Sequence, residues 1–123
     1  MTAIKSRHTK PEIIVRSIIH RLGFRFRLHD AKLPGKPDIV LPRHKKIILV
    51  HGCFWHIHDC KRGNVTPKTN TEYWQNKRFR NVKRDTENLT AYQNGGWQTL
   101  IVWECEINDL LRLKKKLDQF LAA

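Results

Sequence analysis

Acidic residues, long apolar runs and cysteines are all scarce in this chain of 123 residues. Only 11 Asp and Glu stand against 24 Lys and Arg, so the formal net charge is +13 and the sequence pI is about 10.2. No apolar run approaches the length of a transmembrane helix, and the start MTAIKSRHTK lacks an apolar core segment, so we expect neither a membrane span nor a secretory leader. Three cysteines are an odd number, which in a chain without a leader favours metal ligation over disulfides.

The length and the charge indicate one globular domain, residues 1–123, that binds a polyanion. A chain of this size can enclose one hydrophobic core but not two, and its 40% hydrophobic content is typical of globular proteins. The positive excess predicts nucleic acid as the partner, with an affinity that depends steeply on salt. The alternatives are a ribosomal or chaperone-type basic protein, or a charge that serves only solubility.

The hydrophobic pattern predicts a three-layer α/β fold, with helices on a central mixed sheet. Continuous apolar character in the two strands at 46–50 and 97–103 indicates that they are central and buried. The expected elements, in chain order, are a helix capped by Thr9 and stopped at Gly23, strands at 24–28, 38–41 and 46–50, a basic helix from Asn70 or Thr71 to about Gln93, a strand at 97–103, and a helix starting at Asn108.

The stretch HGCFWHIHDC, residues 51–60, is the most unusual part of the sequence. It places three histidines, two cysteines, an aspartate and two adjacent aromatic residues directly after the apolar run IILV. A core strand seldom ends this way, because imidazoles and thiols are costly to bury without partners. The stretch therefore predicts a site that gathers metal ligands, bases and exposed rings.

Part of this stretch has the spacing of a zinc site. Cys53, His58 and Cys60 form the pattern C-x4-H-x-C, and Cys105 follows the other predicted central strand. If the two central strands are neighbours, their ends bring all four side chains together. A Cys3His set is closed and tetrahedral, which is typical of structural rather than catalytic zinc. The alternative is that the thiols are simply free and buried.

The remaining histidines suggest phosphodiester chemistry. Hydrolysis of a phosphodiester needs a cation that polarises the phosphate, a deprotonated water and a stabilised leaving oxygen. Asp38 opens the preceding strand, so a hairpin could bring it beside His51. Asp38 can ligate Mg²⁺ together with a backbone carbonyl near Val50, and His51 or His56 can replace lysine as the base.

The local pattern matches only half of a common nuclease motif. Pro37-Asp38 begins the pattern P-D-(x)n-(D/E)-x-K, but Val50-His51-Gly52 stands where an acid and a lysine are expected. Taken singly, Asp38 could cap a turn, and His51 and His56 could be solvated loop residues. Taken together in a chain of charge +13, they favour a nuclease.

Five segments, in order along nearly the whole chain, resemble the very-short-patch repair (Vsr) mismatch endonuclease family. The resemblance implies a restriction-endonuclease-like fold with a structural Zn²⁺ and a catalytic Mg²⁺. It implies a bacterial, cytoplasmic, nucleoid-associated monomer that nicks double-stranded DNA 5′ of the thymine in a T·G mismatch left by deamination of 5-methylcytosine. Contacts with mismatch-repair proteins are a further expectation. The matching segments are LPGKPDIV (33–40), HGCFWHIHDC (51–60), TEYW (71–74), RNVKRD (80–85) and LIVWEC (100–105).

The resemblance also implies catalytic roles. Asp38 corresponds to the Mg²⁺ ligand, assisted by the Val50 carbonyl. His56 corresponds to the general base, and His51 to a residue that supports the phosphate or the leaving group. Glu12 corresponds to a further active-site acid, a role that competes with its capping-box position in the first helix.

The same family implies a DNA-reading surface. Phe54, Trp55 and Trp74 correspond to rings that wedge into the stack beside the mismatch, where each ring recovers on the order of 1–3 kcal/mol by stacking on bases. Lys77 and Asn81 fall where the family reads the mismatched pair. The alternative for Trp74 is an ordinary core position.

The chain departs from the family pattern at its N-terminal segment, which is short before the first helix, and at Ile57 and Asp59, which replace histidines. The short segment bears on affinity and site preference more than on cleavage. Two other functions stay open. One is a related restriction-type nuclease of different specificity, and the other is a non-catalytic, zinc-stapled DNA-binding module.

Overall fold

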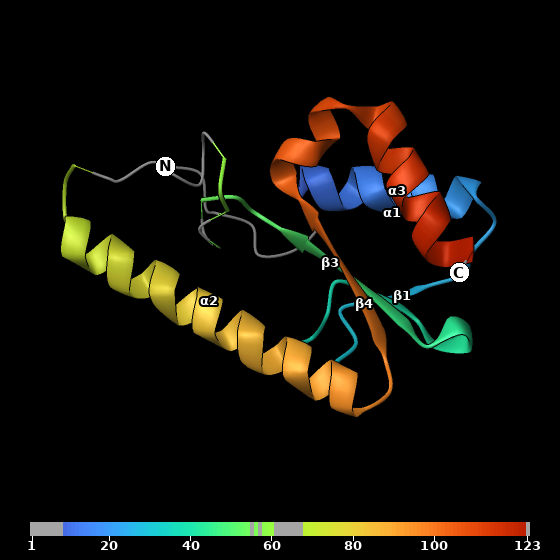
Figure 1. Ribbon diagram of the computed structural model, residues 1–123, viewed down its shortest axis with the longest axis horizontal. Helices are drawn as coiled ribbons and strands as arrows, with labels where there is room; N and C mark the ends of the chain where they lie inside the picture. The colour runs from blue at the N-terminus through green and yellow to red at the C-terminus, as the bar shows by residue number, and fades with distance from the viewer. Residues whose placement is uncertain (1–8, 55, 57, 61–67, 123) are drawn as a thin grey trace.

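The computed structural model describes residues 9–54, 56, 58–60 and 68–122, which form helices around a four-stranded mixed sheet (Figure 1). The strands lie side by side in chain order. The first strand pairs antiparallel with the second, the second pairs antiparallel with the third, and the third and fourth are parallel. The strands are β1 (Arg27–Leu28), β2 (Ile39–Leu41), β3 (Lys46–His51) and β4 (Gln98–Trp103).

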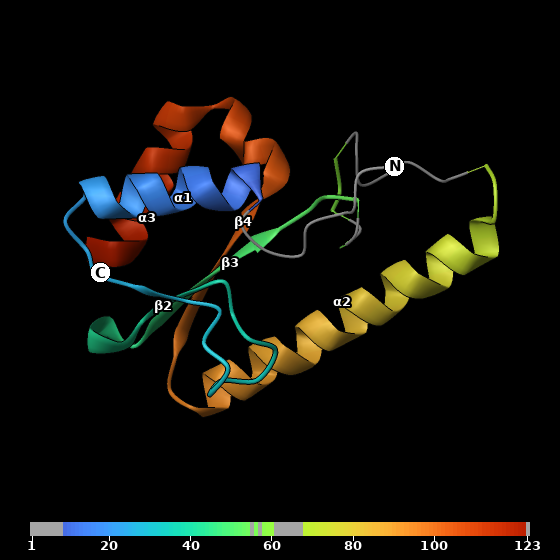
Figure 2. The ribbon, with the colours of Figure 1, turned by 180° about the vertical axis from the view of Figure 1, so that it is seen from behind.

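Helices cover both faces of this sheet (Figures 1 and 2). Helices α1 (Lys10–Arg21) and α3 (Leu110–Ala122) pack on one face, in a core that includes Ile48 of β3. Helix α2 (Thr71–Asn94) crosses the other face, where Tyr92 packs with Val40 and Ile47. The prediction of an α/β fold with helices around a mixed sheet is confirmed.

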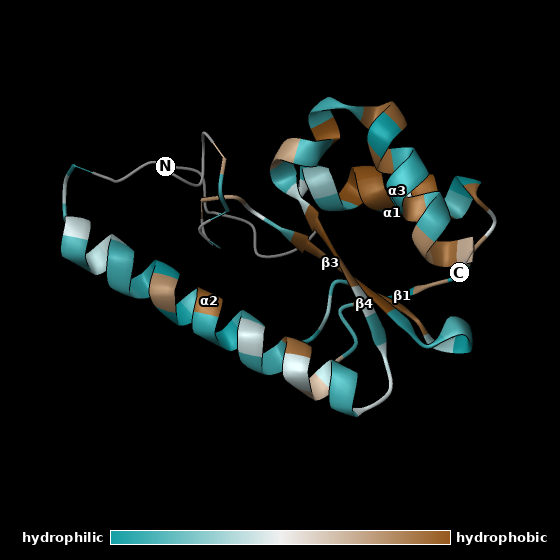
Figure 3. Cartoon of the chain, in the orientation of Figure 1, coloured by the Kyte–Doolittle hydropathy of each residue, from teal (hydrophilic) through white to brown (hydrophobic). Residues whose placement is uncertain are grey.

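Hydropathy separates α2 from the other helices (Figure 3). The strands and the inner sides of α1 and α3 are apolar, whereas α2 is mostly hydrophilic and buries only Arg78 and Tyr92. None of the helices in the described ranges combines the length and the apolar character that a bilayer crossing needs.

Two predicted boundaries differ from the structure by more than one residue. The expected strand at 24–28 is reduced to β1, because β2 offers only three residues before Pro42 begins a short 3-10 turn, η1 (Pro42–His44). The last helix begins at Leu110 rather than Asn108, because a second 3-10 turn, η2 (Glu104–Asn108), occupies the predicted start.

The loop that precedes β2 is held against α2. Gly35 has a φ of +71°, and a β-carbon there would overlap the side-chain amide of Asn88, so this approach requires glycine. The Tyr92 hydroxyl donates a hydrogen bond to the carbonyl of Pro34. These contacts position the start of β2, and with it Asp38.

The parallel pair β3–β4 determines where the candidate site forms. Its register places Val50 beside Val102 and His51 beside Trp103. Parallel strands end at the same edge of a sheet, so the chain leaves both strands together. Residues that follow β3 therefore lie next to residues that follow β4, as the sequence predicted.

Candidate functional site

Three groups of titratable or metal-binding side chains gather around the carboxyl end of β3. Within each group, the ligand atoms all lie within 4.8 Å of one another. We name them the cysteine cluster (Cys53, His58, Cys60 and Cys105), the histidine cluster (His51, His56 and Asp85) and the carboxylate cluster (Glu12, His29 and Asp38).

The cysteine cluster is built by a tight turn after β3 and by the start of η2. The His58 backbone N–H donates to the Cys53 carbonyl at 3.0 Å, and the Cys60 N–H donates to the His58 carbonyl at 2.8 Å. The Cys105 Sγ lies 3.6 Å from His58 Nδ1. The predicted meeting of these four residues is therefore observed, and the set could hold a metal ion.

Burial makes the thiols of this cluster unfavourable as bare anions. It raises the pKa of Cys53 to about 12 and also raises the pKa of Cys105. None of the three cysteines forms a disulfide. A cation bound here would supply the positive charge that stabilises thiolates, and three sulfurs with one imidazole suit a tetrahedral metal. The residues thus fit a structural zinc ion.

The histidine cluster lies on the face of the sheet that α2 covers. The rings of His51 and His56 stack with their centroids 3.9 Å apart and their planes 6° apart. His56 Nδ1 contacts the carboxylate of Asp85, which projects from α2. Trp103 meets the His51 ring edge to face, with 5.3 Å between centroids. A carboxylate–imidazole pair therefore lies directly against a second imidazole.

His51 is held uncharged within this cluster. Its side chain is buried, and this burial, followed by the nearby His56, lowers the pKa of His51 to about 4. Its Nδ1 has no hydrogen-bond partner among the residues that the structure describes. His51 is thus a neutral imidazole with one ring nitrogen that is buried and unsatisfied among the described residues.

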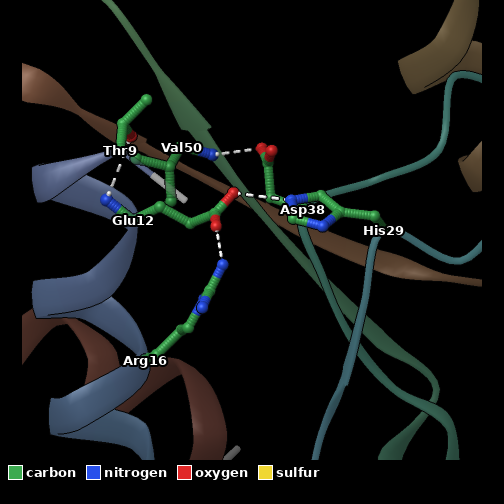
Figure 4. Close-up of polar contacts among 6 residues, drawn as sticks. All are labelled: Thr9, Glu12, Arg16, His29, Asp38 and Val50. Carbon is green, nitrogen blue, oxygen red and sulfur yellow. Dashed lines mark hydrogen bonds and ion pairs between the residues drawn. The ribbon is translucent and has the colours of Figure 1, made fainter. Parts of the chain in front are cut away.

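The carboxylate cluster begins at the first turn of α1 (Figure 4). Thr9 caps the helix by accepting a hydrogen bond from the Glu12 backbone N–H at 3.5 Å. The Glu12 side chain is buried, and its carboxylate contacts Arg16 and lies 2.8 Å from His29 Nε2. The side chain of Glu12 thus faces the cluster, while its backbone serves the cap.

Asp38 joins the carboxylate cluster from the start of β2. Its Oδ2 accepts a hydrogen bond from the Val50 backbone N–H at 2.8 Å. Burial raises the pKa of Asp38 to about 6, a rise that the Val50 hydrogen bond opposes and the nearby Glu12 increases. Successive side chains of a strand point to opposite faces. The side chain of His51, the residue after Val50 in β3, therefore lies on the other face and belongs to the histidine cluster. The carboxylate cluster and the histidine cluster thus adjoin at the end of β3.

Two of the three predicted wedge residues lie together. The rings of Phe54 and Trp74 have centroids 6.2 Å apart in an edge-to-face arrangement, and Tyr73 lies 5.2 Å from Trp74. Trp74 is only partly buried, so it is not an ordinary core residue. Trp55 lies outside the described residues. A partly exposed aromatic group thus lies between the loop after β3 and the first turn of α2.

Basic residues of α2 hold these rings. Arg78 is buried, lies with its guanidinium 4.4 Å from the centre of the Phe54 ring and donates from Nε to the Phe54 carbonyl at 2.7 Å. Lys77 Nζ lies 6.0 Å from the centre of the Trp74 ring. Asn81 follows Lys77 by four positions and so shares its side of the helix.

Sequence reasoning missed four residues of this region, which are Asp85, His29, Trp103 and Arg78. Asp85 carried the best signal, because it is an acid directly after Lys83 and Arg84 and lies in the matching segment RNVKRD. The other three act through contacts between distant segments, and no local spacing indicates them.

Comparison with known proteins finds one family and several relatives that match this chain. Residues 1–62 match the family described as "DNA mismatch endonuclease Vsr". The chain is 44% identical over 98% of its length to the type II nicking enzyme V.XorIIP of Xanthomonas oryzae pv. oryzae, and covers 88% of that protein. It is 40% identical to V.NmeAIP of Neisseria meningitidis serogroup A, over 98% of this chain and 86% of that one. It is also 44% identical to the DNA mismatch endonuclease Vsr of Escherichia coli, over 87% of this chain and 68% of that one.

The chain belongs to the Vsr family. The family predicted from the sequence motifs is therefore confirmed. As a Vsr-family protein, the chain is a DNA mismatch endonuclease or nicking enzyme, and DNA is its substrate. The predicted nuclease activity is confirmed at this level.

The raised pKa of Asp38 leads to a prediction about stability. Folding moves this pKa from 3.8 to about 6, so between these values the folded state holds a proton that the unfolded state has lost. Stability contributed at Asp38 therefore falls as pH rises through this window and stays low above it. Asp38→Asn removes the ionisation and keeps an acceptor for the Val50 N–H. Without divalent cations, we expect it to raise the Tm by several degrees at about pH 7.5, with a gain that disappears at about pH 4.

Differential scanning calorimetry of both proteins across this pH range measures the effect. Asp30→Asn, on the loop just before β2, is the control and should show no such pH-dependent gain. A constant difference between Asp38→Asn and the parent chain at every pH would contradict the prediction.

Proposed function

We propose that this Vsr-family protein nicks one strand of double-stranded DNA on the 5′ side of the thymine in a T·G mismatch, in a Mg²⁺-dependent hydrolysis. The observation that carries the proposal is the arrangement around the end of β3, where the His56–Asp85 pair stacks on neutral His51 and Asp38 binds the adjacent Val50. This arrangement offers a base, a donor and a cation site within a few side chains of one another.

Asp38 and Glu12 are the residues that would hold Mg²⁺. The N–H and C=O of one strand residue point the same way, so the Val50 carbonyl faces the edge that carries Asp38 and can assist. When bound, the cation supplies polarisation of the scissile phosphate and stabilises charge on the leaving oxygen. The buried, mutually repelling carboxylates fit this ion, because positive charge relieves the cost of ionising Asp38.

His56 acts as the general base in this proposal. The Asp85 carboxylate accepts the Nδ1 hydrogen of His56, which leaves Nε2 unprotonated and ready to take a proton from the attacking water. Asp85 then stabilises the imidazolium that forms, as a carboxylate does for the histidine of a catalytic triad.

His51 supports the phosphate or the leaving oxygen. Its ring is neutral and carries one hydrogen, and its Nδ1 lacks a partner among the described residues. A hydrogen bond from the protonated nitrogen of this ring to a DNA oxygen would stabilise developing negative charge.

The aromatic group recognises the mismatch. Phe54 and Trp74, with Trp55 beside them in the sequence, would enter the stack next to the weakly stacked T·G pair. Lys77 and Asn81 lie on one side of α2, from which they would read the pair. The chain's charge of +13 supplies the attraction for the phosphate backbone.

Zn²⁺ is the metal that we propose for the cysteine cluster, with Cys53, His58, Cys60 and Cys105 as its ligands. Our proposals for the fold, the oligomeric state, the location and the protein partners follow from the family resemblance. We propose a restriction-endonuclease-like fold, one domain over residues 1–123, a monomer that works at the bacterial nucleoid, and contacts with mismatch-repair proteins.

A nicking assay tests the proposed specificity. Duplexes that differ only in a T·G or a C·G pair, each with randomised flanking pairs and each strand labelled, are incubated with Mg²⁺ and zinc-loaded protein. We expect one cut 5′ of the mismatched thymine, because a weakly stacked step opens at low cost. Equal cutting of both duplexes would defeat the T·G assignment, and cutting restricted to a different pair would support a nicking enzyme of other specificity.

Removal of the Asp85 carboxylate tests the general base. Asp85→Asn places an amide beside His56, which can hold the ring in the wrong tautomer, so we expect the nicking rate to fall by ~10²- to 10⁴-fold while DNA affinity is retained. Single-turnover nicking measures the rate, and fluorescence anisotropy measures the affinity. Glu87→Gln, an exposed acid of α2 close to Asp85, should leave both unchanged. A rate loss of the same size in both variants would contradict the assignment.

Loss of one thiol tests the zinc site. Cys105→Ser removes a ligand that follows β4, whereas the other three follow β3, so we expect loss of bound zinc and a large fall in Tm. Metal analysis by mass spectrometry and thermal melting measure the two effects. The control is Asp59→Asn, between two ligands but outside the cluster, which should keep its zinc. Full zinc content in Cys105→Ser would rule out the proposed ligand set.

A further inference from the structure

We propose that His29 supplies a nitrogen ligand to the cation of the carboxylate cluster, so that this site prefers a first-row transition metal such as Mn²⁺ or Co²⁺ to Mg²⁺. This inference rests on the proposed function, in which Asp38 and Glu12 hold the catalytic cation. It adds a residue to which sequence reasoning gave no role.

The backbone of His29 is hydrogen-bonded directly to the carboxylate cluster. His29 follows β1 with a φ of 47°, in the left-handed region that few residues other than glycine adopt. Such a conformation persists where the surroundings impose it, and it occurs often at ligand sites. Here the His29 N–H donates to the Asp38 carbonyl at 3.1 Å. The backbone thus ties His29 to the proposed metal ligand Asp38.

The imidazole is already within coordination range of both carboxylates. His29 Nε2 lies 2.8 Å from Glu12 Oε1, and the ligand atoms of Glu12, His29 and Asp38 lie within 4.8 Å of one another. Figure 4 shows these side chains turned toward one another, with Arg16 at the other oxygen of Glu12. His29 and Glu12 expose only 14% and 2% of their side chains, so the site is largely shielded from water.

A metal ion would replace one hydrogen in this arrangement. The short contact between Nε2 and Oε1 is a hydrogen bond, which needs a hydrogen between the two atoms. With the ring hydrogen on Nδ1 instead, Nε2 offers its lone pair, and a cation can take the position between the imidazole and the carboxylates. No side chain has to cross the site for this exchange.

The types of ligand atom decide which cation this site binds more tightly. Mg²⁺ prefers oxygen ligands, whereas imidazole nitrogen binds first-row transition ions more strongly. Two carboxylates and one imidazole therefore favour Mn²⁺ or Co²⁺ over Mg²⁺. The histidines of the histidine cluster face Asp85 instead, so His29 is the imidazole that meets Glu12 and Asp38 among the described residues.

Electron spin echo spectroscopy of Mn²⁺ bound to the zinc-loaded chain tests the inference, because a coordinated imidazole imposes ¹⁴N modulation on the ion. We expect ¹⁴N modulation in the parent chain and its loss in His29→Gln, which keeps a hydrogen-bond donor but presents no imidazole. We also expect His29→Gln to weaken Mn²⁺ binding by ~10-fold or more, with a smaller effect on Mg²⁺, as isothermal titration measures. His20→Gln, on α1, is the matched control and should behave as the parent chain.

Two further variants separate the possible failures. Parent-like Mn²⁺ binding in Asp38→Asn would overturn both this inference and the proposed cation site. Binding that needs Asp38 but shows no ¹⁴N modulation, or the same modulation in His29→Gln, would overturn the role of His29 alone. Modulation lost in His56→Gln and kept in His29→Gln would assign the ion to the histidine cluster and would also overturn the inference. Thermal melting of each variant verifies that it is folded.

Discussion

The parallel pairing of β3 and β4 is the constraint on which the rest of the site depends. Its register sets His51 beside Trp103 and brings the turn that carries Cys53 next to Cys105. Trp103 stacks on His58 with 4.1 Å between ring centroids and meets the edge of His51 at 5.3 Å. One indole ring therefore separates the cysteine cluster from the histidine cluster and contacts both. A slip of one residue would turn Trp103 to the opposite face and part the two clusters.

The same pairing explains why α2 contributes to the candidate active site. Parallel neighbours cannot be joined by a tight turn, so the chain must cross one face of the sheet between them. Helix α2 makes this crossing, and it carries Asp85 to His56 on the way. The acid that orients the candidate base is thus supplied by the element that topology requires. This relation also shows why Asp85 could not be assigned from the pattern of residues around β3.

Several features were predictable because they follow from local patterns. Thr9 and Gly23 bracket α1, and the spacing of the apolar residues gave the central strands closely. The gathering of the four residues of the cysteine cluster could be predicted because both central strands are followed by residues that can bind metal. Other features depend on contacts between distant segments. The length of β1 is set by its partner β2, and His29 adopts a left-handed backbone conformation that no residue pattern indicates.

The electrostatics of the site and of the whole chain act in opposite directions, which makes cation binding and DNA binding interdependent. A charge of +13 attracts phosphate, yet in the proposed mechanism Glu12 and Asp38 place negative charge beside the scissile phosphate. A divalent ion between them removes this repulsion and supplies an attraction instead.

The position of the start of α2 depends on the turn that carries the cysteine cluster. Its first half buries only Arg78, which rests on the ring and carbonyl of Phe54. Phe54 in turn follows Cys53, a residue of the cysteine cluster. The metal that fixes the loop would therefore also position the helix face that carries Lys77 and Asn81. If the proposed roles hold, a metal in the cysteine cluster would support both the residues proposed to read the mismatch and the candidate catalytic histidines, because both are attached to the turn that it would close.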